Sequence, residues 1–208
     1  MKNKILYIPG TVRGTDFQDD QREFDFIISS EKRDTYGTIF TSDGWDFSRY
    51  AENPLVFFQH RSHSNDPDDL IGVTVKGPWK DQLEDGTPII LARVRFEDAE
   101  TNPKAEKIRK KIIAGTIRMA SVGANVTQYR WGDKEVGEDP ETVYFTRQEL
   151  FEWSVVNLGS NPDASVKRMD ETMMEIRKEI QPDPKKEVSK NGISAMVARL
   201  EIVKYKSK

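Results

Sequence analysis

The sequence predicts a mainly β domain of the α+β class, with a few helices and a charged C-terminal tail. Short segments rich in β-branched and aromatic residues alternate with turn sequences, which is typical of a β-barrel or an α+β sheet. The expected strands cover residues 23–29, 71–75, 89–96, 122–129, 142–145 and 151–158. The segments between them, such as residues 84–88 and 137–140, contain the Gly, Pro and Asp that favour turns.

One helix is expected inside the domain, over residues 103–114. Thr101 or Asn102 can cap its first turn, and Pro103 suits the first helical position. Gly115 can end the helix, because glycine adopts the left-handed conformation that closes many helices.

The chain is expected to divide into a domain of residues 1–166 and a tail of residues 167–208. The tail holds 11 Lys/Arg and 7 Asp/Glu, so its balance of +4 leaves -7 for the domain. Of the aromatic residues only Tyr205 lies in the tail, which therefore has little with which to build a core. We expect a helical or disordered segment, with short helices over residues 170–180 and 193–205, that serves in docking or processing.

The composition excludes several kinds of chemistry. The absence of cysteine excludes a thiol nucleophile and every thiolate metal site, and two histidines exclude a three-histidine centre. The acidic residues Glu97, Asp98 and Glu100 are explained by the positive end of the following helix, so no metal is expected. Without a phosphate-binding glycine motif, no nucleotide cofactor is expected either.

The same composition argues against two classes of partner. With a net charge of -3, nucleic acid is not an expected partner. No apolar run approaches the roughly 20 residues of a membrane span, and the first eight residues do not look like a signal peptide. We expect a protein of a reducing, cytosolic setting.

Two residues are candidates for a base and a nucleophile. His60 ends the apolar run of residues 55–58, where its imidazole could emerge beside a cleft, although a structural histidine would have the same setting. Ser121 starts a strand, with Gly123 nearby, and would need an adjacent base to act as a nucleophile. His63 is interpreted as a loop residue.

An acidic residue supplies the third candidate. Alternation along residues 151–158 places Glu152 and Ser154 on one face, and Trp153 on the other. A carboxylate on a mostly apolar strand requires a partner. A histidine would make Glu152 the acid of a Ser-His-acid arrangement, and an arginine is the alternative.

Read together, these segments resemble the prohead maturation proteases of tailed bacteriophages. The resemblance covers roughly residues 22–164. It rests on several short segments in the same order: residues 29–39, 44–50, 53–60, 71–72, 121–123, 152–156 and 160–164. The chain departs from the family in the sequence Leu-Gly-Ser-Asn-Pro at residues 158–162, and in a longer acidic loop after His60.

The resemblance implies a serine endopeptidase with an antiparallel β-barrel and surrounding helices, related to the herpesvirus assembly proteases. Ser121 matches the nucleophile, His60 the base and Glu152 the acid, with Glu149 in reserve. The donors to the oxyanion are expected among the backbone N–H groups of Gly123, Gly159, Ser160 and Asn161.

The family also implies partners and a place of action. The major capsid protein and the scaffold protein are the expected substrates, with possible self-cleavage and a homodimer, inside the prohead in the host cytoplasm. Two other functions are compatible with the sequence: a non-catalytic capsid-assembly or scaffold-binding module, and a small-molecule esterase.

Overall fold

A computed structural model describes residues 5–12, 17–34 and 36–158 of the 208-residue chain. In this part the fold is mainly β, with one sheet of nine strands and two α-helices. The strands are β1 (Ile5–Val12), β2 (Glu23–Ser30), β3 (Thr38–Phe40), β4 (Trp45–Asp46), β5 (Leu55–Phe58), β6 (Leu70–Gln82), β7 (Pro88–Phe96), β8 (Met119–Trp131) and β9 (Val143–Val156). The helices are α1 (Ser48–Glu52) and α2 (Pro103–Ile113), and three short 3-10 turns lie at Ser42–Gly44, Pro67–Asp69 and Lys134–Val136.

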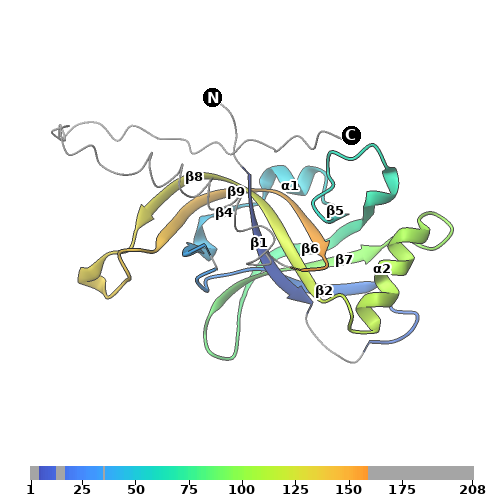
Figure 1. Cartoon of the computed structure of the whole chain (residues 1–208), viewed down its shortest axis with the longest axis horizontal. Helices are drawn as coiled ribbons and strands as arrows, with labels where there is room; N and C mark the ends of the chain where they lie inside the picture. The colour runs from blue at the N-terminus through green and yellow to red at the C-terminus, as the bar shows by residue number, and fades with distance from the viewer. Residues whose placement is uncertain (1–4, 13–16, 35, 159–208) are drawn as a thin grey trace.

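The sheet curls strongly, as Figure 1 shows. Pairing runs from β9 through β5, β6, β7, β2 and β1 to β8, and β8 pairs with β9 again. β3 and β4 pair with the first half of β9, at residues 143–145 and 148–149. The prediction of a mainly β domain with few helices is confirmed.

The predicted antiparallel arrangement is wrong for part of the sheet. β3, β4 and β5 all run parallel to β9, whereas the other pairs are antiparallel. About 100 residues separate these segments from β9, so no hairpin sets the direction in which they pair. The sheet is therefore mixed.

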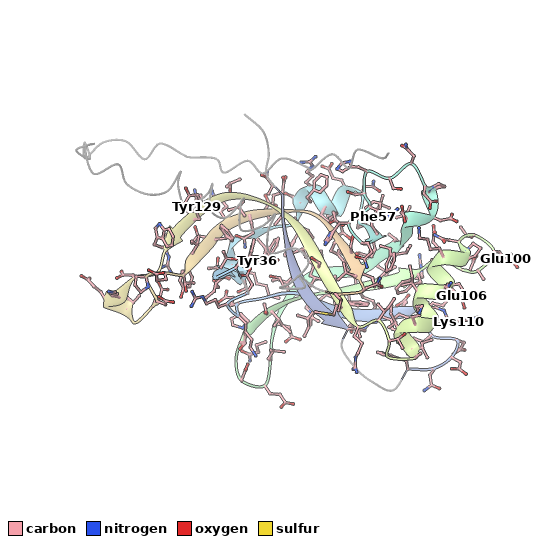
Figure 2. The ribbon with its side chains drawn as sticks, in the orientation of Figure 1. Tyr36, Phe57, Glu100, Glu106, Lys110 and Tyr129 are labelled. Carbon is pink, nitrogen blue, oxygen red and sulfur yellow. The ribbon has the colours of Figure 1, made fainter. Side chains whose placement is uncertain are left out.

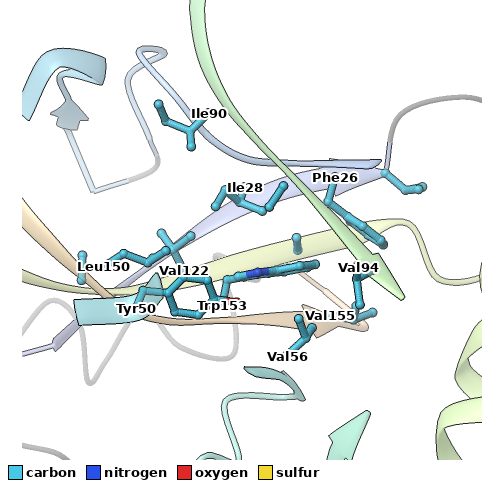
Figure 3. Close-up of a cluster of buried hydrophobic side chains, with 14 of the residues drawn as sticks. Phe26, Ile28, Tyr50, Val56, Ile90, Val94, Val122, Leu150, Trp153 and Val155 are labelled. Carbon is cyan, nitrogen blue, oxygen red and sulfur yellow. The ribbon is translucent and has the colours of Figure 1, made fainter. Parts of the chain in front are cut away.

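The core fills the inside of the curl. Trp153 is fully buried and packs beside Phe26, with ring centroids 5.5 Å apart. Val122 lies opposite Trp153 in the β8/β9 ladder and belongs to the same core, which Figure 3 shows. Trp153 donates its indole N–H to Thr74 Oγ1 at 2.9 Å, so this large side chain is both packed and hydrogen-bonded.

β9 is one continuous strand where the sequence predicts two. The predicted strands over residues 142–145 and 151–158 leave residues 146–150 unassigned, and the structure includes them in β9. The strand continues because long-range partners accept them: the buried Gln148 donates its side-chain N–H to the backbone of Thr41 at 2.8 Å. Phe151 forms a bulge, since Gly123 faces Glu152 while Ala124 faces Leu150.

The helix predicted over residues 103–114 is confirmed as α2. Asn102 is the cap, and its side chain accepts the N–H of Ala105 at 2.9 Å. Pro103 is the first helical residue, and Gly115 follows the end with a φ of 71°. Figure 2 labels Glu106 and Lys110 on this helix.

The sequence did not predict β1, β3, β4 or α1. The tail of residues 167–208 and its two short helices lie outside the described residues. Among those described, no helix has both the length and the apolar character needed to span a membrane.

Candidate active site

Three strands bring the candidate residues together, although their segments are far apart in the sequence. β9 lies between β8 and β5, and Ser154 on β9 faces Ser121 on β8 and Phe57 on β5. Directly opposed residues place their side chains on the same face of a sheet. Ser121 and Ser154 therefore share the face opposite to that of Val122 and Trp153, which point into the core. Phe57, labelled in Figure 2, indicates where β5 lies in this region.

His60 is placed by an unusual turn at the end of β5. The parallel ladder continues until the Gln59 N–H donates to the Val155 carbonyl at 3.0 Å. Gln59 and His60 then have φ values of 59° and 56°, so two successive residues other than glycine lie in the left-handed region. The His60 N–H donates to Ser154 Oγ at 3.2 Å, which fastens this turn to β9.

The His60 imidazole and the Glu152 carboxylate form a short hydrogen bond. His60 Nδ1 lies 2.6 Å from Glu152 Oε1. The two side chains are 19% and 3% exposed, so the pair is largely shielded from water. The other carboxylate oxygen, Oε2, accepts the Ser154 hydroxyl at 2.7 Å. A carboxylate that accepts from Nδ1 favours the neutral tautomer in which the proton is on Nδ1 and Nε2 carries the lone pair of a base.

Ser121 lies next to this pair in the sheet. It faces Ser154, whose hydroxyl contacts Glu152, and Gly123 faces Glu152 itself. Ser121 is 3% exposed and Ser154 is fully buried. The register thus places a serine hydroxyl, an imidazole and a carboxylate in one small region, the three groups that acyl transfer through a serine requires.

The two acids named from the sequence have different surroundings. Glu152 contacts His60 and Ser154, and in the described part of the chain its partner is not the alternative arginine. Glu149 lies beyond the bulge and pairs with Arg49 at 3.5 Å, in a setting where Arg49 is 58% exposed. Of the two acids, Glu152 is the one that contacts the imidazole, and Glu149 pairs with Arg49.

The remaining candidates are placed as follows. His63 stacks against the ring of Phe151, with centroids 6.0 Å apart, and Arg49 lies over the same ring at 5.5 Å. Gly123 lies inside β8, where it pairs with both β1 and β9. The other three candidate oxyanion donors, Gly159, Ser160 and Asn161, lie outside the described residues.

Two features of the site were not found from the sequence. Ser154 contacts both His60 and Glu152, and strand alternation already placed it on the face of Glu152, so this signal was present but unused. The left-handed turn at Gln59 and His60 had no signal, because neither residue is a glycine or asparagine. In the described ranges, no group of three or more His, Asp or Glu side chains is arranged to hold a metal ion.

Comparison with known proteins gives one match. No curated protein and no solved structure matches the chain. The model of the Caudovirus prohead serine protease family matches residues 90–179, a range that contains Ser121 and Glu152 and begins after His60. The resemblance found in the sequence is therefore confirmed: over residues 90–179 the chain matches the Caudovirus prohead serine protease family.

Proposed function

We propose that the chain is a serine endopeptidase in which Ser121 is the nucleophile, His60 the general base and Glu152 the acid that orients the base. The observation that carries this proposal is the 2.6 Å hydrogen bond between His60 Nδ1 and Glu152 Oε1, next to the register position of Ser121. The family match, whose description names a serine protease, supports the same chemistry independently.

The reaction proceeds by acyl transfer. His60 Nε2 takes the proton of the Ser121 hydroxyl, whose oxygen attacks the carbonyl carbon of a peptide bond. The tetrahedral intermediate collapses when His60 returns the proton to the leaving amine. A water molecule, activated by the same base, then attacks the acyl-enzyme and releases the second product.

Glu152 and the backbone have separate tasks in this reaction. Glu152 holds the imidazole tautomer and stabilises the imidazolium, whose positive charge forms as the proton moves. Backbone N–H groups stabilise the oxyanion. Gly123, Gly159, Ser160 and Asn161 are the proposed donors.

The proposed biological role is capsid maturation. The substrates are the scaffold protein and the N-terminal segment of the major capsid protein, cleaved inside the prohead in the host cytoplasm, with self-cleavage as a further reaction. The family description supports this role. We also propose that the fold is a barrel related to the herpesvirus assembly proteases and that the chain forms a homodimer. The tail at residues 167–208 is proposed to dock to scaffold.

The test compares the wild-type chain with Ser121→Ala in two assays. In the first, each is co-expressed with the capsid and scaffold proteins of the same phage, and the products are measured by intact mass. In the second, each purified protein is treated with a small dialkyl fluorophosphate, and the adduct is located by peptide mass. We expect cleavage and an adduct on Ser121 only in the wild-type chain.

The control variant is Ser29→Ala, which removes a buried serine hydroxyl on β2. It should cleave and react like the wild-type chain. If wild type and Ser121→Ala give the same uncleaved products and no adduct forms, the protease proposal is refuted. The alternative function of a non-catalytic capsid-assembly module would then remain. Cleavage that persists in Ser121→Ala would show that another protease is responsible.

A further inference from the structure

Ser154 occupies the centre of the site without being one of the three proposed reacting groups. It lies on β9 between Ser121 and Phe57 and is fully buried. Leaving a buried hydroxyl without hydrogen-bond partners costs stability, so the partners that a buried serine does have are informative. The partners that Ser154 has are the two groups on which the orientation of the base depends.

The hydrogen bonds of Ser154 have a fixed direction. Its oxygen accepts the backbone N–H of His60 at 3.2 Å, and its hydrogen is donated to Glu152 Oε2 at 2.7 Å. The carboxylate accepts at both oxygens, since His60 Nδ1 meets Oε1 at 2.6 Å. Because the Ser154 hydroxyl donates its only proton to the Glu152 carboxylate and not to an imidazole, it lacks the base that activates a serine nucleophile.

These contacts form a closed ring of hydrogen bonds that begins and ends at His60. The ring runs from the His60 backbone to Ser154, then to Glu152, and back to the His60 imidazole. The backbone of His60 is thereby connected to its own side chain through two residues of β9. Such a ring fixes the imidazole relative to β9. This strand carries Glu152, and its Ser154 faces Ser121.

The backbone at this point needs such a connection. Gln59 and His60 both have positive φ values, 59° and 56°, which residues with a Cβ rarely adopt. Conformations of this kind persist only where surrounding contacts hold them, and they concentrate at functional sites. The Ser154 oxygen provides a contact to the second of the two residues.

We propose that Ser154 is a positioning residue that holds the His60 imidazole and the Glu152 carboxylate in the geometry needed for proton transfer. Its effect on the reaction rests on the proposed protease function. The hydrogen-bond ring itself does not depend on that function, so the two can be tested separately.

The experiment compares wild type, Ser154→Ala and the control Ser29→Ala. Ser29 is also a buried serine on a strand, but its hydroxyl has no hydrogen-bond partner among the described residues. The first measurement is the proton NMR signal of the imidazole Nδ1–H, which is simple to assign because the chain has two histidines. The second is the rate of inactivation by a small dialkyl fluorophosphate.

In wild type and Ser29→Ala we expect a protected, downfield Nδ1–H signal from His60. In Ser154→Ala this signal should be lost to exchange with water, and the inactivation rate should fall by about 10- to 100-fold, the scale of a misplaced reacting group. A Ser154→Ala variant that keeps both the signal and the rate would overturn the positioning role while leaving the protease intact.

Two further outcomes are distinguishable. If the fluorophosphate does not react with the wild-type chain, the protease proposal fails, and the Nδ1–H signal still decides the role of Ser154. If Ser154→Ala does not fold, amide hydrogen exchange in the wild type decides it. The His60 amide should then exchange slowly, and rapid exchange would overturn the proposal.

Discussion

Replacing Glu152 by glutamine should abolish most of the reactivity of Ser121. The substitution keeps the size and planarity of the side chain but removes its negative charge. The Glu152 side chain is 3% exposed and His60 19% exposed, so water screens their interaction only weakly. The imidazolium that forms during proton transfer would lose its counter-charge, and the Nδ1 tautomer would lose the acceptor that holds it.

The size of the effect follows from this geometry. Nδ1 and Oε1 are 2.6 Å apart, which places the centres of the two charges about 4 Å apart. At an effective dielectric constant of about 20 the attraction is about 4 kcal/mol. Because about 1.4 kcal/mol corresponds to a factor of ten in rate, the inactivation rate should fall by about 10³-fold. The equivalent substitution in a Ser-His-Asp enzyme costs about 10⁴-fold.

The assay measures the second-order rate of inactivation by the fluorophosphate for wild type, Glu152→Gln and the matched control Glu149→Gln. Glu149 is the other acid that the family resemblance permits, and it pairs at 3.5 Å with the exposed Arg49. An exposed ion pair contributes little, so the control should change the rate by less than about 5-fold. A larger loss in Glu149→Gln than in Glu152→Gln would refute this assignment of the acid.

Two further predictions concern stability. Thr74→Val removes the hydroxyl that accepts the Trp153 indole N–H at 2.9 Å and contacts the Tyr50 hydroxyl at 2.7 Å. This substitution should lower the free energy of unfolding in urea by about 1–3 kcal/mol. An equal loss in Thr74→Ser, which keeps a hydroxyl, would argue against the hydrogen bonds as the cause. Hydrogen bonds from Arg109 lower the pKa of Glu106 from 4.5 to about 2, so the folded state gains stability above pH 4.5 that is lost as the pH falls toward 2. Glu106→Gln should therefore cost about 1–2 kcal/mol at pH 7, reduced by solvent near the pair, and the difference from wild type should shrink between pH 4.5 and pH 2; a difference independent of pH would contradict this cause.

Local signals account for what the sequence predicts well. α2 was predicted to within a residue, because Asn102, Pro103 and Gly115 are themselves the start and stop signals. The common face of Glu152 and Ser154 was predicted from strand alternation alone. In both cases the information lies within a few residues of the feature.

Long-range pairing accounts for what was not predicted. The parallel direction of β5 beside β9 depends on segments about 100 residues apart. β1 contains Pro9 and Gly10, which argue locally against a strand, yet its backbone pairs with β8. The contact between His60 and Glu152 could be expected only from the family resemblance, since 92 residues separate them.

The central position of β9 has a consequence for synthesis. β9 carries Glu152 and Ser154, joins β5 to β8, and is the last described strand along the chain. A nascent chain that ends before residue 143 already contains His60 and Ser121 but lacks the strand that brings them together. Contacts this distant in sequence also form slowly in folding. Ser121, His60 and Glu152 can therefore come together only after translation has passed β9, so the proposed protease could not act from a chain that ends before this strand.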